Sequence, residues 1–146
     1  MSPYEYRLLA DGFSDIDDFD QAEAYFIKAV AKATHTIDRS IIIRSYGRLI
    51  FIEGRHDEAR KKFESALAEI VGTGDRATFY RLETLERWSI LEGEIGNFAQ
   101  QRQLLDAAIS QARNYANSKR STAEVARLLV RAAAINPNGG DAAGAA

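Results

Sequence analysis

The amino-acid sequence predicts an all-α fold made of helical hairpins. Proline occurs only at positions 3 and 137 of the 146 residues, so nothing between these positions forces a helix to break. Apolar residues recur at three- and four-residue spacing along most of the chain, which is the period of one helix face. Glycines and capping residues interrupt this pattern at intervals. We therefore expect seven helices and no sheet, with the helices at about residues 3–12, 18–34, 38–53, 56–71, 75–94, 97–116 and 121–136.

Local signals define the boundaries of several of these helices. The segment Ser2-Pro3-Tyr4-Glu5 is a capping box with proline at the first helical position, where its missing N–H costs nothing. Gly54 follows the third segment, in the position where a left-handed residue ends a helix. The third segment, 38–53, is rich in β-branched residues, which are typical of strands. Its length and the helical spacing of its polar residues favour a helix.

The sequence contains an internal repeat in which small and aromatic residues recur at fixed offsets. Its clearest copy has a large residue beside a small one, then a turn glycine, then a small, an aromatic and a small residue: Tyr46-Gly47, Ile50, Gly54, Ala59, Phe63 and Ala66. Shifted back by 37 residues, the template meets Leu9-Ala10, Phe13, Asp17, Ala22, Phe26 and Ala29. Shifted forward by 42 residues, it meets Trp88-Ser89, Glu92, Gly96, Gln101, Leu105 and Ala108.

This pattern resembles the tetratricopeptide repeat. Small residues at helix crossings let two helices approach to about 8–10 Å. Both repeat spacings exceed the family's usual length of about 34 residues, and Glu92 and Gln101 replace an apolar and a small residue, so the chain resembles a divergent member. The resemblance implies an α–α superhelix of about three helix pairs, at 3–34, 38–71 and 75–116. A capping helix at 121–136 would complete one domain over residues 1–136, with Val125, Leu128, Leu129, Ala132 and Ile135 buried and Arg127 and Arg131 facing water.

Composition excludes several classes of protein. The chain has 19 basic and 21 acidic residues, whereas nucleic-acid binding depends on an excess of Lys and Arg. It has no cysteine, no secretory signal pattern and no apolar run of about 20 residues that would span a bilayer. We expect a cytoplasmic protein with neither a nucleic-acid nor a membrane partner. Residues 137–146 contain only Pro, Asn, Gly, Asp and Ala, and we expect a disordered tail.

The reactive side chains do not form a recognisable catalytic or metal-binding pattern. His35 and His56 are the only histidines, and a solvated or capping role suits both better than catalysis or zinc binding. The acidic cluster of Asp15, Asp17, Asp18 and Asp20 lacks the glycine and closing glutamate of a calcium loop. The segment Gly72-Thr73-Gly74 lacks the Lys-Ser or Lys-Thr of a phosphate loop. We expect no enzyme activity, no cofactor and no metal.

The remaining candidate is a protein-binding surface. In the tetratricopeptide family the first helix of each pair lines a concave groove, and the template places five candidate residues there: Arg7, Arg44, Arg48, Phe51 and Ile52. The arginines could bind an acidic segment of a partner peptide or protein, and the apolar pair could seat one of its side chains. Alternatively, Asp11, Glu83 and Glu86 neutralise these arginines. An adaptor or scaffold is the leading hypothesis, and a homo-oligomeric structural subunit and a secretion-type chaperone are the alternatives.

Overall fold

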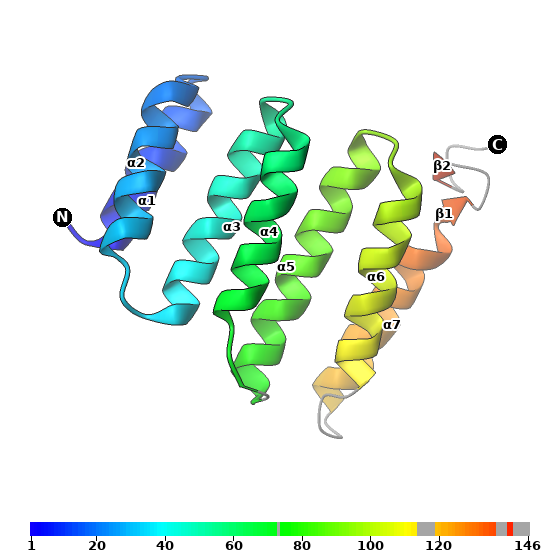
Figure 1. Ribbon diagram of the computed structural model, residues 1–146. Helices are drawn as coiled ribbons and strands as arrows, with labels where there is room; N and C mark the ends of the chain where they lie inside the picture. Colours follow the sequence, from blue (N-terminus) through cyan, green and yellow to red (C-terminus); the bar gives the residue numbers. More distant parts are fainter. Residues whose placement is uncertain (73, 114–118, 137–139, 142–146) are drawn as a thin grey trace. The chain divides into compact units, whose positions relative to one another are not determined.

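The computed structural model describes residues 1–72, 74–113, 119–136 and 140–141. This part of the chain forms seven helices (Figure 1), which confirms the all-α prediction. The helices are α1 (Pro3–Asp15), α2 (Phe19–Lys32), α3 (Thr36–Ile52), α4 (His56–Glu69), α5 (Asp75–Glu94), α6 (Phe98–Arg113) and α7 (Lys119–Ala133). Two short strands follow, β1 (Ile135–Asn136) and β2 (Gly140–Asp141).

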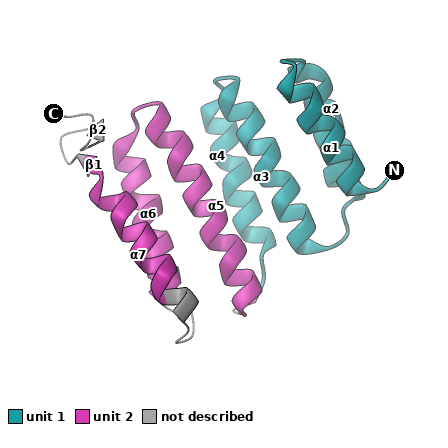
Figure 2. Cartoon of the chain, turned by 180° about the vertical axis from the view of Figure 1, so that it is seen from behind, with its two compact units in different colours: residues 1–71 teal, residues 72–146 magenta. Residues whose placement is uncertain are grey.

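The chain divides into two compact units, Met1–Val71 and Gly72–Ala146, coloured separately in Figure 2. In the first unit α1 packs on α2 and α3 packs on α4, while α2 also contacts α3. In the second unit α5 packs on α6, and α6 packs on α7. Each unit is therefore built from helical hairpins, and the second ends in an additional helix.

The first helix begins as predicted but extends further. The Ser2 backbone N–H donates to the Glu5 carboxylate at 2.6 Å, and the Glu5 N–H donates to the Ser2 hydroxyl at 3.2 Å. The predicted end at about Gly12 is wrong, because α1 continues to Asp15. The ring of Phe13 stacks on Tyr25 of α2 at 5.5 Å between centroids, so the helix keeps an apolar contact past the glycine.

The turns inside the three hairpins share one backbone geometry. The repeat template aligns Asp17, Gly54 and Gly96, and these residues have φ angles of 60°, 88° and 79°. The residues that follow them are Asp18, Arg55 and Asn97. Their backbone N–H groups donate to the carbonyls of Phe13, Ile50 and Glu92, respectively, at 2.9–3.0 Å. This is the Schellman arrangement that ends a helix. The sequence repeat is therefore matched by a repeated backbone structure.

Small residues lie at the helix crossings in all three hairpins. The side chains of Ala10, Ala22, Ala29, Ala59, Ala66, Ser89 and Ala108 are fully buried. A Cβ atom added to Gly47 would lie 3.1 Å from the Cβ of Lys62 and 3.3 Å from the ring of Phe63. In the third hairpin, Gln101 stands where the repeat has a small residue, and Gly93 leaves room for its side chain. A Cβ atom added to Gly93 would lie 2.5 Å from the Gln101 amide nitrogen.

The C-terminal part differs from the prediction in three ways. Helix α7 ends at Ala133 instead of 136, because β1 pairs antiparallel with β2, Ile135 opposite Asp141 and Asn136 opposite Gly140. The expectation of no sheet is wrong at these residues, since backbone pairing needs no large apolar side chain. The disordered tail expected over residues 137–146 stays a prediction. Residues 114–116, 137–139 and 142–146 lie outside the described part of the chain.

The third difference concerns which side of α7 is buried. Leu128, Ala132 and Ile135 are buried, as expected, whereas Val125 is only half-buried. Leu129 was expected to be buried but is 43% exposed. Arg127 and Arg131 do not simply face water, because both contact Glu86 on α5. The orientation of α7 is thus set by ion pairs as well as by its apolar stripe.

Candidate functional site

The first unit contains an open hollow between the start of α1 and the first turns of α3. Its volume is about 470 Å³, and its lining residues are Ser2, Pro3, Tyr4, Arg7, Asp38, Ile41 and Ile42. The capping box holds the start of α1 in place, so the Tyr4 ring is presented at the surface with 60% exposure. The Arg7 guanidinium lies 5.4 Å from the centroid of that ring. An aromatic face, aliphatic groups and a cation therefore line one hollow.

Two of the predicted arginines act on the same carboxylate. The Nε atom of Arg7 lies 3.9 Å from an Asp11 carboxylate oxygen. Burial raises the pKa of Asp11, while the nearby charges of Arg7 and Arg48 oppose this rise. Arg48 is exposed on α3. Arg7 therefore pairs with Asp11, and Arg48 is near enough for its charge to act on the same carboxylate.

The structure does not present the other predicted residues together. Arg44 is 9% exposed and Phe51 is 3% exposed, and the Phe51 ring lies 4.5 Å from the His56 ring. Burial is extensive on this helix because α3 contacts both α2 and α4. Arg44 and Phe51 are therefore corrected from surface positions to buried ones. Ile52 is 48% exposed on the last turn of α3, although it does not line the hollow.

A second polar cluster in the first unit was not found by sequence reasoning. The Tyr46 hydroxyl donates to the Glu23 carboxylate at 2.7 Å, and Arg55 donates to the same carboxylate at 2.7 and 3.3 Å. The hydrogen bond from Arg55 lowers the pKa of Glu23, and burial followed by the Glu23 contact raises the pKa of Tyr46. These residues join α2, α3 and the turn before α4. No local pattern links Glu23 to a residue 32 positions away.

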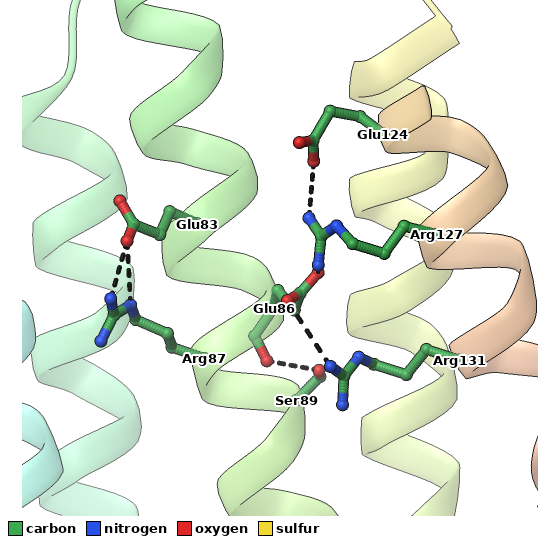
Figure 3. Close-up of polar contacts among 7 residues, drawn as sticks. All are labelled: Glu83, Glu86, Arg87, Ser89, Glu124, Arg127 and Arg131. Carbon is green, nitrogen blue, oxygen red and sulfur yellow. Dashed lines mark hydrogen bonds and ion pairs between the residues drawn. The ribbon is translucent and has the colours of Figure 1, made fainter. Parts of the chain in front are cut away.

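In the second unit, Glu86 on α5 is the centre of an ion-pair network with α7 (Figure 3). Arg127 donates to one Glu86 carboxylate oxygen, and Arg131 lies 3.8 Å from the other. Arg127 also donates to Glu124 at 2.5 Å, and this bond raises the pKa of Arg127. Glu83 accepts from Arg87 on its own helix at 2.7 Å. Three acidic residues were candidates to neutralise the predicted arginines. Asp11 pairs with Arg7, whereas Glu86 pairs with arginines of α7 and Glu83 pairs with Arg87.

The remaining sequence candidates do not assemble into a reactive centre. His35 lies 4.0 Å from Asp38 at the start of α3, and His56 contacts Phe51. Across the described ranges, no three His, Asp or Glu side chains are grouped as a metal site requires. None of the helices in those ranges is long and apolar enough to cross a membrane. No protein-family model matches the chain, and no curated protein sequence matches it.

Proposed function

We propose that the chain is a divergent tetratricopeptide-like repeat protein that binds a segment of another protein and has no catalytic activity. Support for the repeat comes from the shared turn geometry at Asp17, Gly54 and Gly96 and from the buried small residues at the crossings. Such hairpins commonly form extended surfaces for peptide recognition. An adaptor or scaffold role in the cytoplasm is the form of this proposal that we favour.

The observation that carries the proposal is the α1–α3 hollow. Tyr4 and Ile41 offer apolar surface, and Tyr4 has a hydroxyl that can form hydrogen bonds with a ligand. Aromatic residues of this kind are enriched at the centres of binding interfaces. We propose that an apolar side chain of the partner enters the hollow between these two residues.

Charge suggests how the partner's segment is oriented. Arg7 is on the wall of the hollow, and the exposed Arg48 lies close enough to Asp11 to affect its pKa. Asp38 is negative and lies on the α3 wall of the hollow. A carboxylate of the partner is therefore received on the Arg7 and Arg48 side, where guanidinium groups can donate paired hydrogen bonds. Arg44 and Phe51 are omitted from this site because they are buried.

A displayed library of random peptides tests the proposal directly. We expect selected peptides to carry an acidic residue next to an aromatic or aliphatic one. The double variant Arg7→Glu, Arg48→Glu and the variant Tyr4→Ala should each weaken binding at least about tenfold. The matched control is Lys32→Glu, Lys61→Glu, which makes the same change in net charge at exposed positions on α2 and α4. Equal binding by the double variant and its control would place recognition elsewhere.

A further inference from the structure

The second unit contains a hollow between α5, α6 and α7, with a volume of about 600 Å³. Its apolar lining comes from all three helices and from β1, namely Ile90, Phe98, Val130 and Ile135. The side chain of Val130 is apolar and yet 72% exposed. Hollows of this size, with an apolar wall and a few polar groups at defined places, are typical of sites for small molecules.

Arg131 gives this α5–α7 hollow a cation whose hydrogen-bond donors are not taken by the fold. Arg127 donates to both Glu86 and Glu124, whereas Arg131 lies 3.8 Å from Glu86, which is too far for a hydrogen bond (Figure 3). The Arg131 Nε atom is buried without a hydrogen-bond partner. The side chain as a whole is 40% exposed and lines the hollow. The outer nitrogen atoms of Arg131 can therefore donate to an acceptor placed there.

The charged and apolar parts of the hollow follow one another along its length. Helices α5 and α7 run in the same direction (Figure 1), and Glu86 of α5 is in contact with Arg131 of α7. Ile90 lies one turn after Glu86, and Ile135 lies four residues after Arg131. Apolar side chains thus follow the arginine on both walls. Glu94, one turn further along α5, also lines the hollow and disfavours a negative charge at that end.

These features are complementary to a small molecule with a carboxylate at one end and an apolar body. The carboxylate accepts hydrogen bonds from Arg131, as carboxylates do from guanidinium groups elsewhere. The apolar body lies against Ile90, Phe98 and Ile135 and covers Val130. We propose that the second unit binds a free aliphatic carboxylate of medium chain length in the α5–α7 hollow. This site lies in a different unit from the α1–α3 hollow and does not depend on peptide binding there.

Titration of the isotope-labelled full chain with octanoate, followed by the chemical shifts of its backbone amides, tests the proposal. We expect saturable shifts centred on residues 90–101 and 127–135, with a dissociation constant of about 1 mM or below. Hexanoate should bind several-fold more weakly, since each buried methylene group contributes up to about fourfold. Acetate should not bind, because it lacks the apolar body. Octanol and octylammonium should bind at least about tenfold more weakly than octanoate, because neither carries a carboxylate for the arginine.

Two variants identify the cation. Arg131→Gln should weaken octanoate binding at least about tenfold and leave octanol binding unchanged, because only the carboxylate contacts the guanidinium. Arg87→Gln is the matched control, since Arg87 is exposed on α5 and pairs with Glu83 of the same helix; it should bind octanoate as the unchanged protein does. Far-ultraviolet circular dichroism should show that both variants keep their helices.

Three results would overturn the proposal for the α5–α7 hollow. The first is that the unchanged protein shows no saturable binding of octanoate, or shows shifts that lie outside the hollow. The second is that octanol binds as tightly as octanoate. The third is that Arg131→Gln and Arg87→Gln bind octanoate equally well, in which case the charge of Arg131 has no part in recognition.

Discussion

Asp17 and Gly54 occupy the same place in two successive hairpin turns and have the same left-handed backbone conformation, with φ angles of 60° and 88°. Glycine adopts this conformation without strain, whereas a residue with a Cβ is strained by about 1 kcal/mol. The N–H of the next residue donates to a helix carbonyl in both turns. The turn therefore imposes the conformation, and the residue type determines its cost.

Exchanging the residue types at these two turns should move stability in opposite directions. We expect Asp17→Gly to stabilise the fold by about 0.5–1 kcal/mol and Gly54→Ala to destabilise it by about 1 kcal/mol. Chemical denaturation followed by circular dichroism measures both changes. Gly12→Ala serves as a comparison, because Gly12 is within α1 and has no neighbouring atoms that a Cβ would meet; this variant should be stabilising. A neutral Asp17→Gly would mean that interactions of the aspartate side chain offset the strain.

The crossing residues predict a second contrast on a single helix. Ala22 is fully buried on α2, whereas Ala24 is exposed two positions later. Ala22→Leu should lower the free energy of unfolding by about 1–3 kcal/mol, because a well-packed crossing has no room for a larger side chain. Ala24→Leu should change it by less than about 0.5 kcal/mol. Similar melting temperatures for the two variants would contradict the crossing geometry.

The elements that the sequence predicted best are those determined by neighbouring residues. The capping box at Ser2 and the left-handed turn at Gly54 depend on residues within one helical turn. The burial of Arg44 and Phe51 depends instead on which helices surround α3, which the repeat template does not specify. Arg127 is exposed to water as the sequence suggested, but its pairing with Glu86 joins residues 41 positions apart, and the sequence did not indicate this contact.

The contact between Glu23 and Arg55 predicts a pH dependence of stability. The hydrogen bond from Arg55 lowers the folded-state pKa of Glu23 below its ordinary value of 4.5. A carboxylate with a lowered folded-state pKa stabilises the fold above its unfolded-state pKa, and this stabilisation is lost as the pH falls through the folded-state value. Arg55→Gln should therefore cost about 0.5–1 kcal/mol at pH 7, since the pair is partly exposed to solvent.

The cost of Arg55→Gln should diminish as the pH falls below about 4.5, because Glu23 is then protonated in the unfolded chain. Urea denaturation of both proteins between pH 3 and pH 7 measures the difference. Arg60→Gln is the control, because Arg60 pairs with the highly exposed Asp57 on its own helix at 2.8 Å. A cost of Arg55→Gln that stays constant across this range would show that Glu23 is not the residue responsible.

The ion pairs at Glu86 should hold α7 against α5 in the second unit. The Glu86 side chain is only 15% exposed, and it contacts both Arg127 and Arg131. Glu86→Ala leaves both arginines without this partner, and we expect it to cost about 1–2 kcal/mol. The loss should be local, because α7 also packs on α6 through Leu128 and Ala132. Hydrogen exchange should therefore accelerate most in Lys119–Ala133 and much less in α5, with the helices of the first unit unchanged.

Asp106→Ala is the matched control, since Asp106 pairs with Arg102 on α6 at 3.4 Å and is 61% exposed. Added salt should weaken the Glu86 contacts and reduce the difference between Glu86→Ala and the unchanged protein. If α7 exchanges at the same rate in Glu86→Ala and in the unchanged protein, the apolar contacts with α6 alone hold the helix in place.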